Sequence, residues 1–158
     1  MIVVGMADLN VAAAPGSLTT IGLGSCVGIA LYDGIRKIAG LAHVMLPSSR
    51  LIQNNANAAK FADTAIIKLI NDMARAGAKR ESMKAKIAGG AQMFAFNSTN
   101  EAMRIGDRNV EATLKVLGEL GIPVVGTDTG EDYGRTVELY ADDGRFLIKT
   151  VGRGSRIL

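Results

Sequence analysis

Short apolar runs, separated by glycines and polar turns, dominate the first part of the chain. Residues 1–5 predict a short buried strand, and residues 17–23 predict a second short strand. Between them, residues 10–16 end in Pro15-Gly16, a pair typical of turns, and predict a loop. The chain therefore begins as β-structure with tight connections.

A hairpin is the clearest element that the pattern predicts. Residues 27–32 are apolar, Asp33-Gly34 is a hairpin-turn signal, and residues 37–46 form the return strand. Cys26 begins the first strand and His43 lies late in the second, at similar distances from the turn. Because antiparallel pairing brings such positions together, the hairpin predicts that Cys26 and His43 are neighbours.

Two segments show the three-to-four-residue spacing of amphipathic helices. The first spans about residues 58–76 and ends at Gly77, and the second spans about residues 107–119 and ends at Gly121. Residues 48–57, before the first helix, predict a mobile polar surface loop. The predicted core faces are Phe61, Ala65, Leu69 and Met73 on the first helix, and Val110, Leu114 and Leu117 on the second.

The remaining segments predict further strands and loops. A loop runs from Gly89-Gly90 to about residue 103, and residues 127–134, with Asp128 among them, predict a solvated turn. The predicted strands are residues 84–88, 123–126, 137–140 and 146–151, the last two forming a hairpin.

This order of elements predicts an α/β fold of the mixed α+β kind, as a single domain over residues 1–158. We expect mixed and antiparallel sheets packed together and flanked by two main helices. Parallel pairing is expected only at the two βαβ-like steps around the helices.

Composition excludes several classes of protein. Hydrophobic residues make up 48% and charged residues 21%, as in soluble globular proteins. The net charge is only +3, and no dense basic run with interleaved aromatics is present, which argues against nucleic-acid binding. Neither a signal peptide nor a membrane-spanning run is found, so we expect a cytoplasmic protein without membrane insertion.

The chain has one cysteine and one histidine, the two groups that thiol catalysis requires. Cys26 follows Gly24 and Ser25, where a sharply turning backbone can aim N–H groups at an oxyanion. The competing interpretation is that Cys26 is a small buried hydrophobe and His43 an ordinary core histidine.

A third group is needed to orient the imidazole. Thr19 and Thr20 both lie in the strand before the cysteine, and the sequence does not choose between them. Their ordinary interpretation is β-propensity alone.

No cofactor or metal ion is expected. Gly22, Gly24 and Gly28 lack the spacing of a dinucleotide-binding turn, and no strand-to-helix step follows them. No Cys/His cluster has the spacing of a zinc site.

Several segments, taken together and in order, resemble the chemoreceptor glutamine deamidases, the CheD family of bacterial and archaeal chemotaxis. The resemblance covers nearly the whole chain except residues 48–57 and the end. The matching stretches are Leu23-Gly24-Ser25-Cys26, Ala42-His43-Val44-Met45-Leu46-Pro47, Lys60-Phe61-Ala62-Asp63, Lys86-Ile87-Ala88-Gly89-Gly90-Ala91-Gln92-Met93-Phe94, Ile105-Gly106-Asp107-Arg108-Asn109-Val110, and Asp128-Thr129-Gly130 with Gly134-Arg135.

The resemblance implies a CheD-like fold, with Cys26 as nucleophile, His43 as base and Thr20 as the third member. It implies deamidation of chosen glutamine side chains in chemoreceptors, with release of ammonia and without a cofactor. It also implies a possible partner, a CheC-type phosphatase, and the alternative function is a binding module that regulates that phosphatase with little catalysis. We expect a monomer when the protein is alone, because no long apolar surface stripe is left over.

Overall fold

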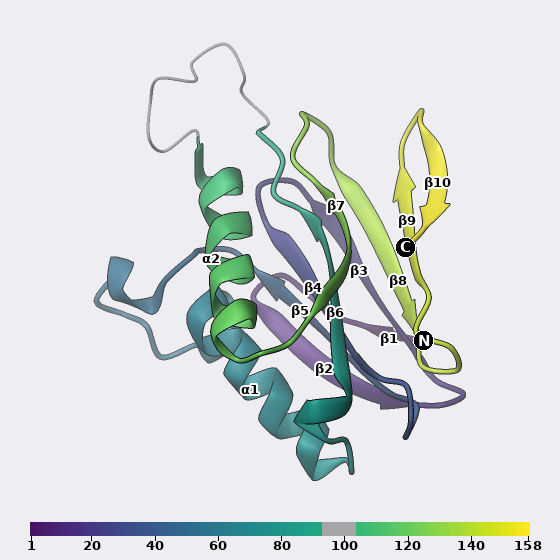
Figure 1. Cartoon of the computed structure of the whole chain (residues 1–158). Coiled ribbons are helices and arrows are strands. Elements are labelled where there is room, and N and C mark those ends of the chain that lie inside the picture. Colours follow the sequence, from purple (N-terminus) through teal and green to yellow (C-terminus); the bar gives the residue numbers. More distant parts are fainter. Residues whose placement is uncertain (93–103) are drawn as a thin grey trace.

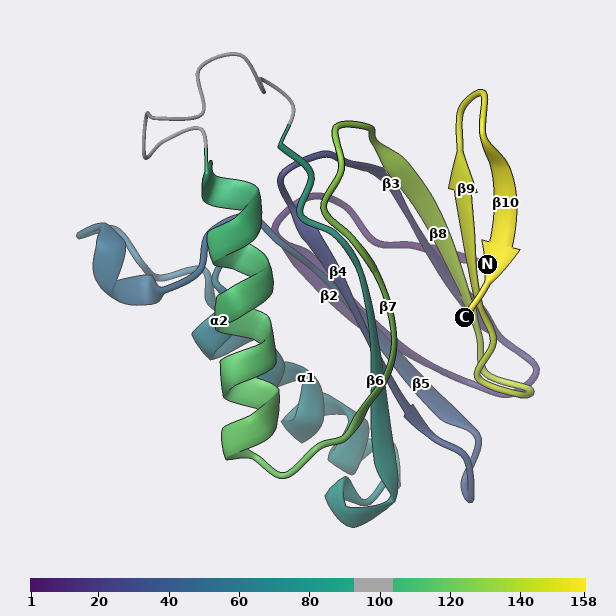
Figure 2. The same cartoon turned by 45° about the horizontal axis from the view of Figure 1, so that its top comes forward.

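The computed structural model covers the whole chain, and the structure describes residues 1–92 and 104–158. Three layers follow one another: two helices, a central five-stranded sheet and an outer five-stranded sheet (Figures 1 and 2). This arrangement confirms the predicted class, mixed sheets packed together and flanked by two main helices.

The central sheet has the strand order β2-β5-β4-β6-β7. All neighbours are antiparallel except β6 and β7, which helix α2 (Ile105–Glu119) connects in parallel. The step through helix α1 (Ala62–Arg75) joins β5 to β6, but β4 lies between those two strands. The strands are β2 (Asp8–Ala13), β4 (Val27–Asp33), β5 (Ile38–Val44), β6 (Met83–Gly89) and β7 (Val124–Thr129).

The outer sheet has the strand order β1-β3-β8-β9-β10. Its β8–β9 hairpin was predicted, whereas the parallel pairing of β1 with β3 and the last strand were not. The strands are β1 (Ile2–Val3), β3 (Ser17–Leu23), β8 (Arg135–Tyr140), β9 (Phe146–Thr150) and β10 (Gly154–Ile157).

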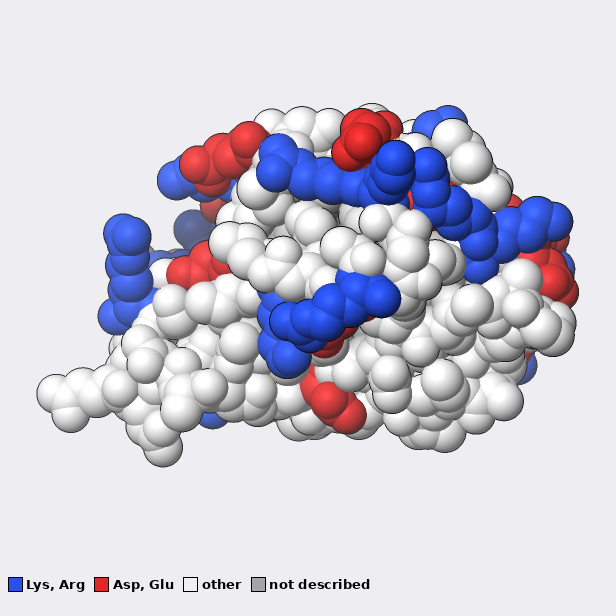
Figure 3. Space-filling model, turned by 90° about the horizontal axis from the view of Figure 1, so that it is seen from below, with Lys and Arg blue, Asp and Glu red and all other residues white. Residues whose placement is uncertain are grey.

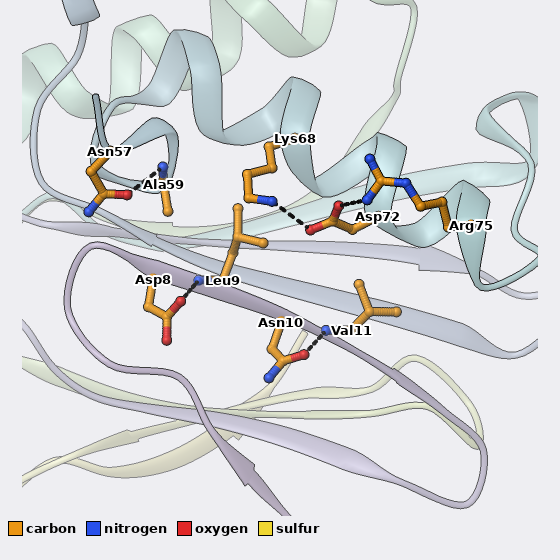
Figure 4. Close-up of polar contacts among 9 residues, drawn as sticks. All are labelled: Asp8, Leu9, Asn10, Val11, Asn57, Ala59, Lys68, Asp72 and Arg75. Atoms are coloured by element: carbon orange, nitrogen blue, oxygen red, sulfur yellow. Dashed lines mark hydrogen bonds and ion pairs between the residues drawn. The ribbon is translucent and has the colours of Figure 1, made fainter. Parts of the chain in front are cut away.

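The prediction for the N-terminal segments was partly wrong. β1 is only two residues long and exposed, and the edge strand β2 includes residues 10–13, which were predicted as part of a loop over residues 10–16. The side chains of Asp8 and Asn10 accept hydrogen bonds from the N–H groups of Leu9 and Val11, each at 2.8 Å (Figure 4). These side chains occupy backbone donors that an edge strand otherwise leaves open, which explains how Asp8 and Asn10 are accommodated in a strand here.

Helix α1 (Ala62–Arg75) covers one face of the central sheet with the predicted apolar stripe. It packs closely over Gly40 of β5, where a Cβ would lie 2.7 Å from the Met73 sulfur. On the solvent side, Asp72 pairs with Lys68 and Arg75 (Figure 4). Three short 3₁₀ turns flank the helix: η1 (Ser49–Leu51), η2 (Ala58–Lys60), which Asn57 caps, and η3 (Arg80–Ser82).

Helix α2 (Ile105–Glu119) buries only part of the predicted face: Leu117 is buried as predicted, but the other two residues are not. Leu114 is 41% exposed and Val110 is only partly buried. The fully buried positions are Gly106, Asn109, Thr113 and Leu117. The buried face is therefore mostly small or polar, because it packs against backbone as well as against side chains.

Two apolar cores result from the three layers. In β5, Ile38, Ala42 and Val44 face the helices, while Ala39 and Leu41 face the outer sheet. His43 therefore projects between the two sheets, because side chains alternate along a strand. Among the described residues, no helix is long and apolar enough to cross a membrane.

The lower end of the molecule, which carries the β4–β5 turn, has a mixed charge distribution. Figure 3 shows a band of Lys and Arg side chains across this end, with Asp and Glu side chains beside it. Cys26 lies at the other end of β4, away from this band.

Candidate functional site

Cys26 lies in the short connection between β3 and β4 and is 8% exposed. Within β3, the pairing with β8 shifts register between Thr20 and Leu23, and Gly22 there has φ +77°. A glycine is favoured at this bulge because side chains destabilise such a conformation. The bulge turns Leu23 into the core between the sheets and directs the chain towards Cys26.

All three carbonyls of the Cys26 loop accept hydrogen bonds. The Gly24 carbonyl accepts from Ala91 N–H at 2.9 Å, and the Cys26 carbonyl accepts from Gly90 N–H at 2.8 Å. The Ser25 carbonyl accepts from the side chain of a buried residue of α2 at 2.9 Å. These three hydrogen bonds to its carbonyl groups therefore fix the conformation of the loop.

The N–H groups of the same loop are arranged differently. Gly24 N–H donates to the Gly22 carbonyl at 3.1 Å, so it is already occupied. Within the described ranges, the N–H groups of Ser25 and Cys26 donate to no backbone carbonyl. Two adjacent N–H groups beside a thiol, with no backbone carbonyl as acceptor among the described residues, are suited to bind a developing oxyanion.

His43 lies on the neighbouring strand β5 and is 1% exposed. The ladder pairs His43 with Gly28 and Val44 with Val27, so Cys26 lies diagonally from His43 and not directly opposite. The position of the turn predicted that Cys26 and His43 lie directly opposite each other, whereas the residue opposite His43 is Gly28, two positions further along. The prediction was right about proximity, because diagonal neighbours on one sheet face remain close.

Thr20 is the threonine that contacts the imidazole. Its Oγ1 lies 2.7 Å from His43 Nδ1 and 2.7 Å from the Val4 carbonyl oxygen. Thr19 instead donates to the Val137 carbonyl at 2.8 Å. The structure thus makes the choice that the sequence left open.

The Thr20 contacts determine the tautomer of His43. A carbonyl oxygen only accepts, so the single hydroxyl proton of Thr20 goes to Val4. The Thr20 oxygen must then accept a proton from Nδ1–H, which leaves Nε2 with its lone pair. His43 Nε2 is buried and has no hydrogen-bond partner among the described residues. This nitrogen is therefore an unprotonated base on the sheet face that carries the thiol.

Burial keeps both groups neutral. It raises the pKa of the Cys26 thiol above its ordinary value, and the backbone N–H of Cys26 only partly opposes this shift. Burial also lowers the pKa of the His43 imidazole below its ordinary value. The resting site therefore holds a thiol and an imidazole, not a thiolate–imidazolium pair.

The lowered pKa of His43 makes stability depend on pH. The unfolded chain binds a proton at His43 below about pH 6.5, whereas the folded state binds it only at lower pH. We therefore expect the free energy of unfolding to fall as the pH is lowered from 7 to 5, and to fall less in a His43→Gln variant. Denaturant titrations at each pH measure this difference, and equal slopes for the two proteins would contradict it.

A buried ion pair anchors the turn after β7 beside the end of β6. Arg135 is fully buried, and its Nε donates to Asp128 at 2.8 Å while Nη1 donates to the Gly130 carbonyl at 3.0 Å. Gly130 N–H in turn donates to the Gly89 carbonyl at 3.0 Å. The interpretation of this turn as merely solvated was wrong for Asp128, because its charge is compensated by an arginine that follows in the chain.

Asn109 and Arg135 lie within the stretches that carry the family resemblance, but the sequence alone assigned neither of them a role. For Asn109 a signal was available in its position, because it shares a helical face with Gly106, Thr113 and Leu117. Met93 and Phe94, which also lie within these stretches, are outside the described residues.

A cavity of about 540 Å³ lies elsewhere, beside the β4–β5 turn, and Tyr32, Lys84, Val125 and Gly144 are among its lining residues. It is at the end of β4 remote from Cys26 and plays no part in the arrangement above. Among the described residues, no group of three or more His, Cys, Asp or Glu side chains is placed to hold a metal ion.

Comparisons with known proteins give a consistent result. The sequence profile described as CheD chemotactic sensory transduction matches residues 45–150. The "Probable chemoreceptor glutamine deamidase CheD" of Caldanaerobacter subterraneus subsp. tengcongensis is 56% identical, over 98% of this chain and 96% of that protein. The "Chemoreceptor glutamine deamidase CheD" of Halalkalibacterium halodurans is 53% identical, over 97% of this chain and 95% of that protein.

Among solved structures, the hypothetical protein YfiH of Bacillus licheniformis has a TM-score of 0.45 and 18% sequence identity. The match covers 78% of this chain and 49% of that one, and the likeness is too slight to bear on function.

Proposed function

The chain belongs to the CheD family, and from this premise we propose that it is a chemoreceptor glutamine deamidase with Cys26 as its nucleophile. It hydrolyses glutamine side chains of chemoreceptors to glutamate and releases ammonia. The observation that carries the residue assignment is the Thr20–His43 contact, which leaves a bare Nε2 on the face that bears the only cysteine.

The first half of the reaction forms a thioester. His43 Nε2 takes the proton of the Cys26 thiol as the sulfur attacks the carboxamide carbon, and a C–S bond forms. The carbonyl oxygen becomes an oxyanion, which the N–H groups of Ser25 and Cys26 bind. Gly24 helps to position the Cys26 loop, because its carbonyl accepts a hydrogen bond from Ala91 N–H. His43 then gives its proton to the amide nitrogen, the C–N bond breaks and ammonia leaves.

The second half regenerates the enzyme. His43 takes a proton from a water molecule whose oxygen attacks the thioester carbon, and a second oxyanion forms at the same backbone donors. The C–S bond breaks, glutamate is released, and the proton on His43 returns to the Cys26 sulfur. Because the resting pair is neutral, His43 is in its basic form at neutral pH without prior deprotonation.

The assay for this function follows amide-to-acid conversion by peptide mass analysis of a chemoreceptor cytoplasmic domain incubated with the protein. Conversion at discrete glutamines supports the proposal. Unchanged receptor peptides, together with tight binding of a CheC-type phosphatase, would favour the regulatory binding module instead.

Replacement of Thr20 tests the orienting role. In Thr20→Val the hydroxyl that accepts from Nδ1–H is gone, so the imidazole can rotate or adopt the other tautomer. We expect kcat to fall about 10²-fold with little change in KM, because tautomer control by a triad partner is worth up to about 10⁴. Thr20→Ser, which keeps the hydroxyl, is the matched control and retains most of the activity. Equal rates for the Val and Ser variants would exclude this role.

Other expectations from the sequence and from the resemblance stay proposals. We propose one CheD-like domain over residues 1–158, action in the cytoplasm on receptor helices, a monomer when alone, and a possible CheC-type phosphatase partner. The relatives' printed names support the receptor as substrate and do not mention these finer points.

A further inference from the structure

Three buried side-chain atoms have no hydrogen-bond partner in the part of the chain that the structure describes: His43 Nε2, Asn109 Oδ1 and Arg135 Nη2. An unpaired buried polar group destabilises the folded state, so such groups require an explanation. The mechanism explains His43, because Nε2 must stay free to receive the thiol proton. Asn109 has no such role so far, although it contacts the same segments.

Asn109 connects the two strands that bear the reacting groups. It lies on the buried face of α2, is 0% exposed, and its Nδ2 donates to the Ser25 carbonyl at 2.9 Å and to the Met45 carbonyl at 3.0 Å. Both neighbours are acceptors, so the amide cannot be reversed without placing its oxygen against two carbonyls. The unpaired Oδ1 follows from this requirement.

The two carbonyls lie just beyond the end of the β4–β5 ladder. The last paired residues are Val27 and Val44, so Ser25 and Met45 lie where the two strands no longer bond to each other. Two acceptors cannot join without a donor between them. Asn109 supplies both donors from one NH₂ group and holds the open end of the hairpin together.

This contact determines the direction of the oxyanion donor. In a trans peptide, the Ser25 carbonyl and the Cys26 N–H point in opposite directions within one plane. A hydrogen bond that fixes the carbonyl therefore also fixes the N–H. The other end of the contact holds the chain two residues after His43, so nucleophile, oxyanion donor and base share one anchor.

Helix α2 is a rigid support for this anchor. Gly106, one turn before Asn109, packs so closely that a Cβ would collide with the carbonyl oxygens of Gly90 and Ala91. The N–H groups of Gly90 and Ala91 hold the other two carbonyls of the Cys26 loop. The helix thus holds one carbonyl of the loop directly and packs against the segment that holds the other two.

We propose that Asn109 is a positioning residue of the deamidase, which aligns the Cys26 N–H and the His43 strand through the Ser25 and Met45 carbonyls. The inference rests on the proposed function. It predicts a loss in kcat, because small displacements of reacting groups lower the rate of the chemical step about 10²-fold.

The test compares Asn109→Asp with the wild type in the receptor deamidation assay. Aspartate has the same shape, but it offers oxygens to both carbonyls instead of hydrogens. We expect kcat to fall about 10²-fold while KM stays within about twofold. Asn109→Ala, which removes both donors without adding a charge, is the second variant if the first does not fold.

Thr113→Val is the matched control. Thr113 is equally buried on the same helix face, but its hydroxyl donates only to the Asn109 backbone carbonyl at 2.8 Å. We expect kcat within about twofold of the wild type, even if thermal stability drops as much as in the Asn109 variants.

The outcomes are distinguishable. A folded Asn109 variant with wild-type kcat, a rise in KM alone, or an equal kcat loss in Thr113→Val would each overturn the positioning role while wild-type activity upholds the proposed function. A wild-type protein that deamidates no receptor would overturn the proposed function, and the inference with it.

Discussion

Cys26→Ala stops amide-to-acid conversion of a chemoreceptor cytoplasmic domain, with a loss on the order of 10⁴-fold or more. The reason is specific to this chain: Cys26 is the only thiol, so no other sulfur can form the thioester. The N–H groups of Ser25 and Cys26, which donate to no backbone carbonyl among the described residues, remain in the variant. They have no tetrahedral intermediate to stabilise when nothing attacks the carboxamide.

The fold survives this substitution. Alanine removes one sulfur atom from the core between the two sheets, and we expect the free energy of unfolding to change by about 1 kcal/mol. Circular dichroism and a denaturant titration check the fold, and peptide mass analysis checks the reaction. Cys26→Ser is the matched control of similar shape, and it is also inactive because a neutral imidazole does not readily deprotonate an alcohol placed for a thiol. Substantial activity in Cys26→Ala would refute the mechanism.

His43→Gln lowers kcat about 10³-fold or more, because among the described residues His43 is the only base on this sheet face that can take the thiol proton. Its amide can still contact the Thr20 hydroxyl, so the packing between the sheets is largely kept. The remaining rate comes from the small thiolate fraction of Cys26, which grows with pH. Because burial raises the pKa of the Cys26 thiol, we expect the variant's residual activity to increase continuously with pH through the alkaline range, while the wild type is active at neutral pH.

The double variant Cys26→Ala/His43→Gln provides the control for this role. Residues that act as one unit give strongly non-additive losses, so the double variant is no slower than Cys26→Ala alone. If the kcat of His43→Gln depended on pH in the same way as the kcat of the wild type, His43 would not be the base.

Local patterns in the sequence predicted the elements that carry the site. β3 matches the predicted strand at residues 17–23, and the turn signal at Asp33-Gly34 predicted the β4–β5 hairpin. The apolar stripe of α1 was also predicted, because periodic spacing reflects burial of one face. These features depend on residues that are close in the chain, and for that reason the sequence alone placed Cys26 near His43.

Other elements were wrong or missed because their cause lies elsewhere in the molecule. The edge strand β2 was predicted as a loop, since its polar residues belong to a strand only when their side chains cap its open edge. The predicted buried face of α2 was chosen from its apolar residues, such as Leu114. The observed buried face is instead determined by the close approach of Gly106 to the backbone of residues 90–91. A hydrophobic pattern does not report packing against backbone.

The amino-acid sequence by itself determined the residue types of the chemistry, one thiol and one imidazole, and the hairpin that brings them to one face. Only the tertiary structure decided how the imidazole and the loop that bears the thiol are oriented. The stacking of the outer sheet places Thr20, and not Thr19, against His43, 23 residues away. The docking of α2 places Asn109 on the Ser25 carbonyl, 84 residues away. Contacts over such separations follow from how layers pack, which no short-range pattern encodes.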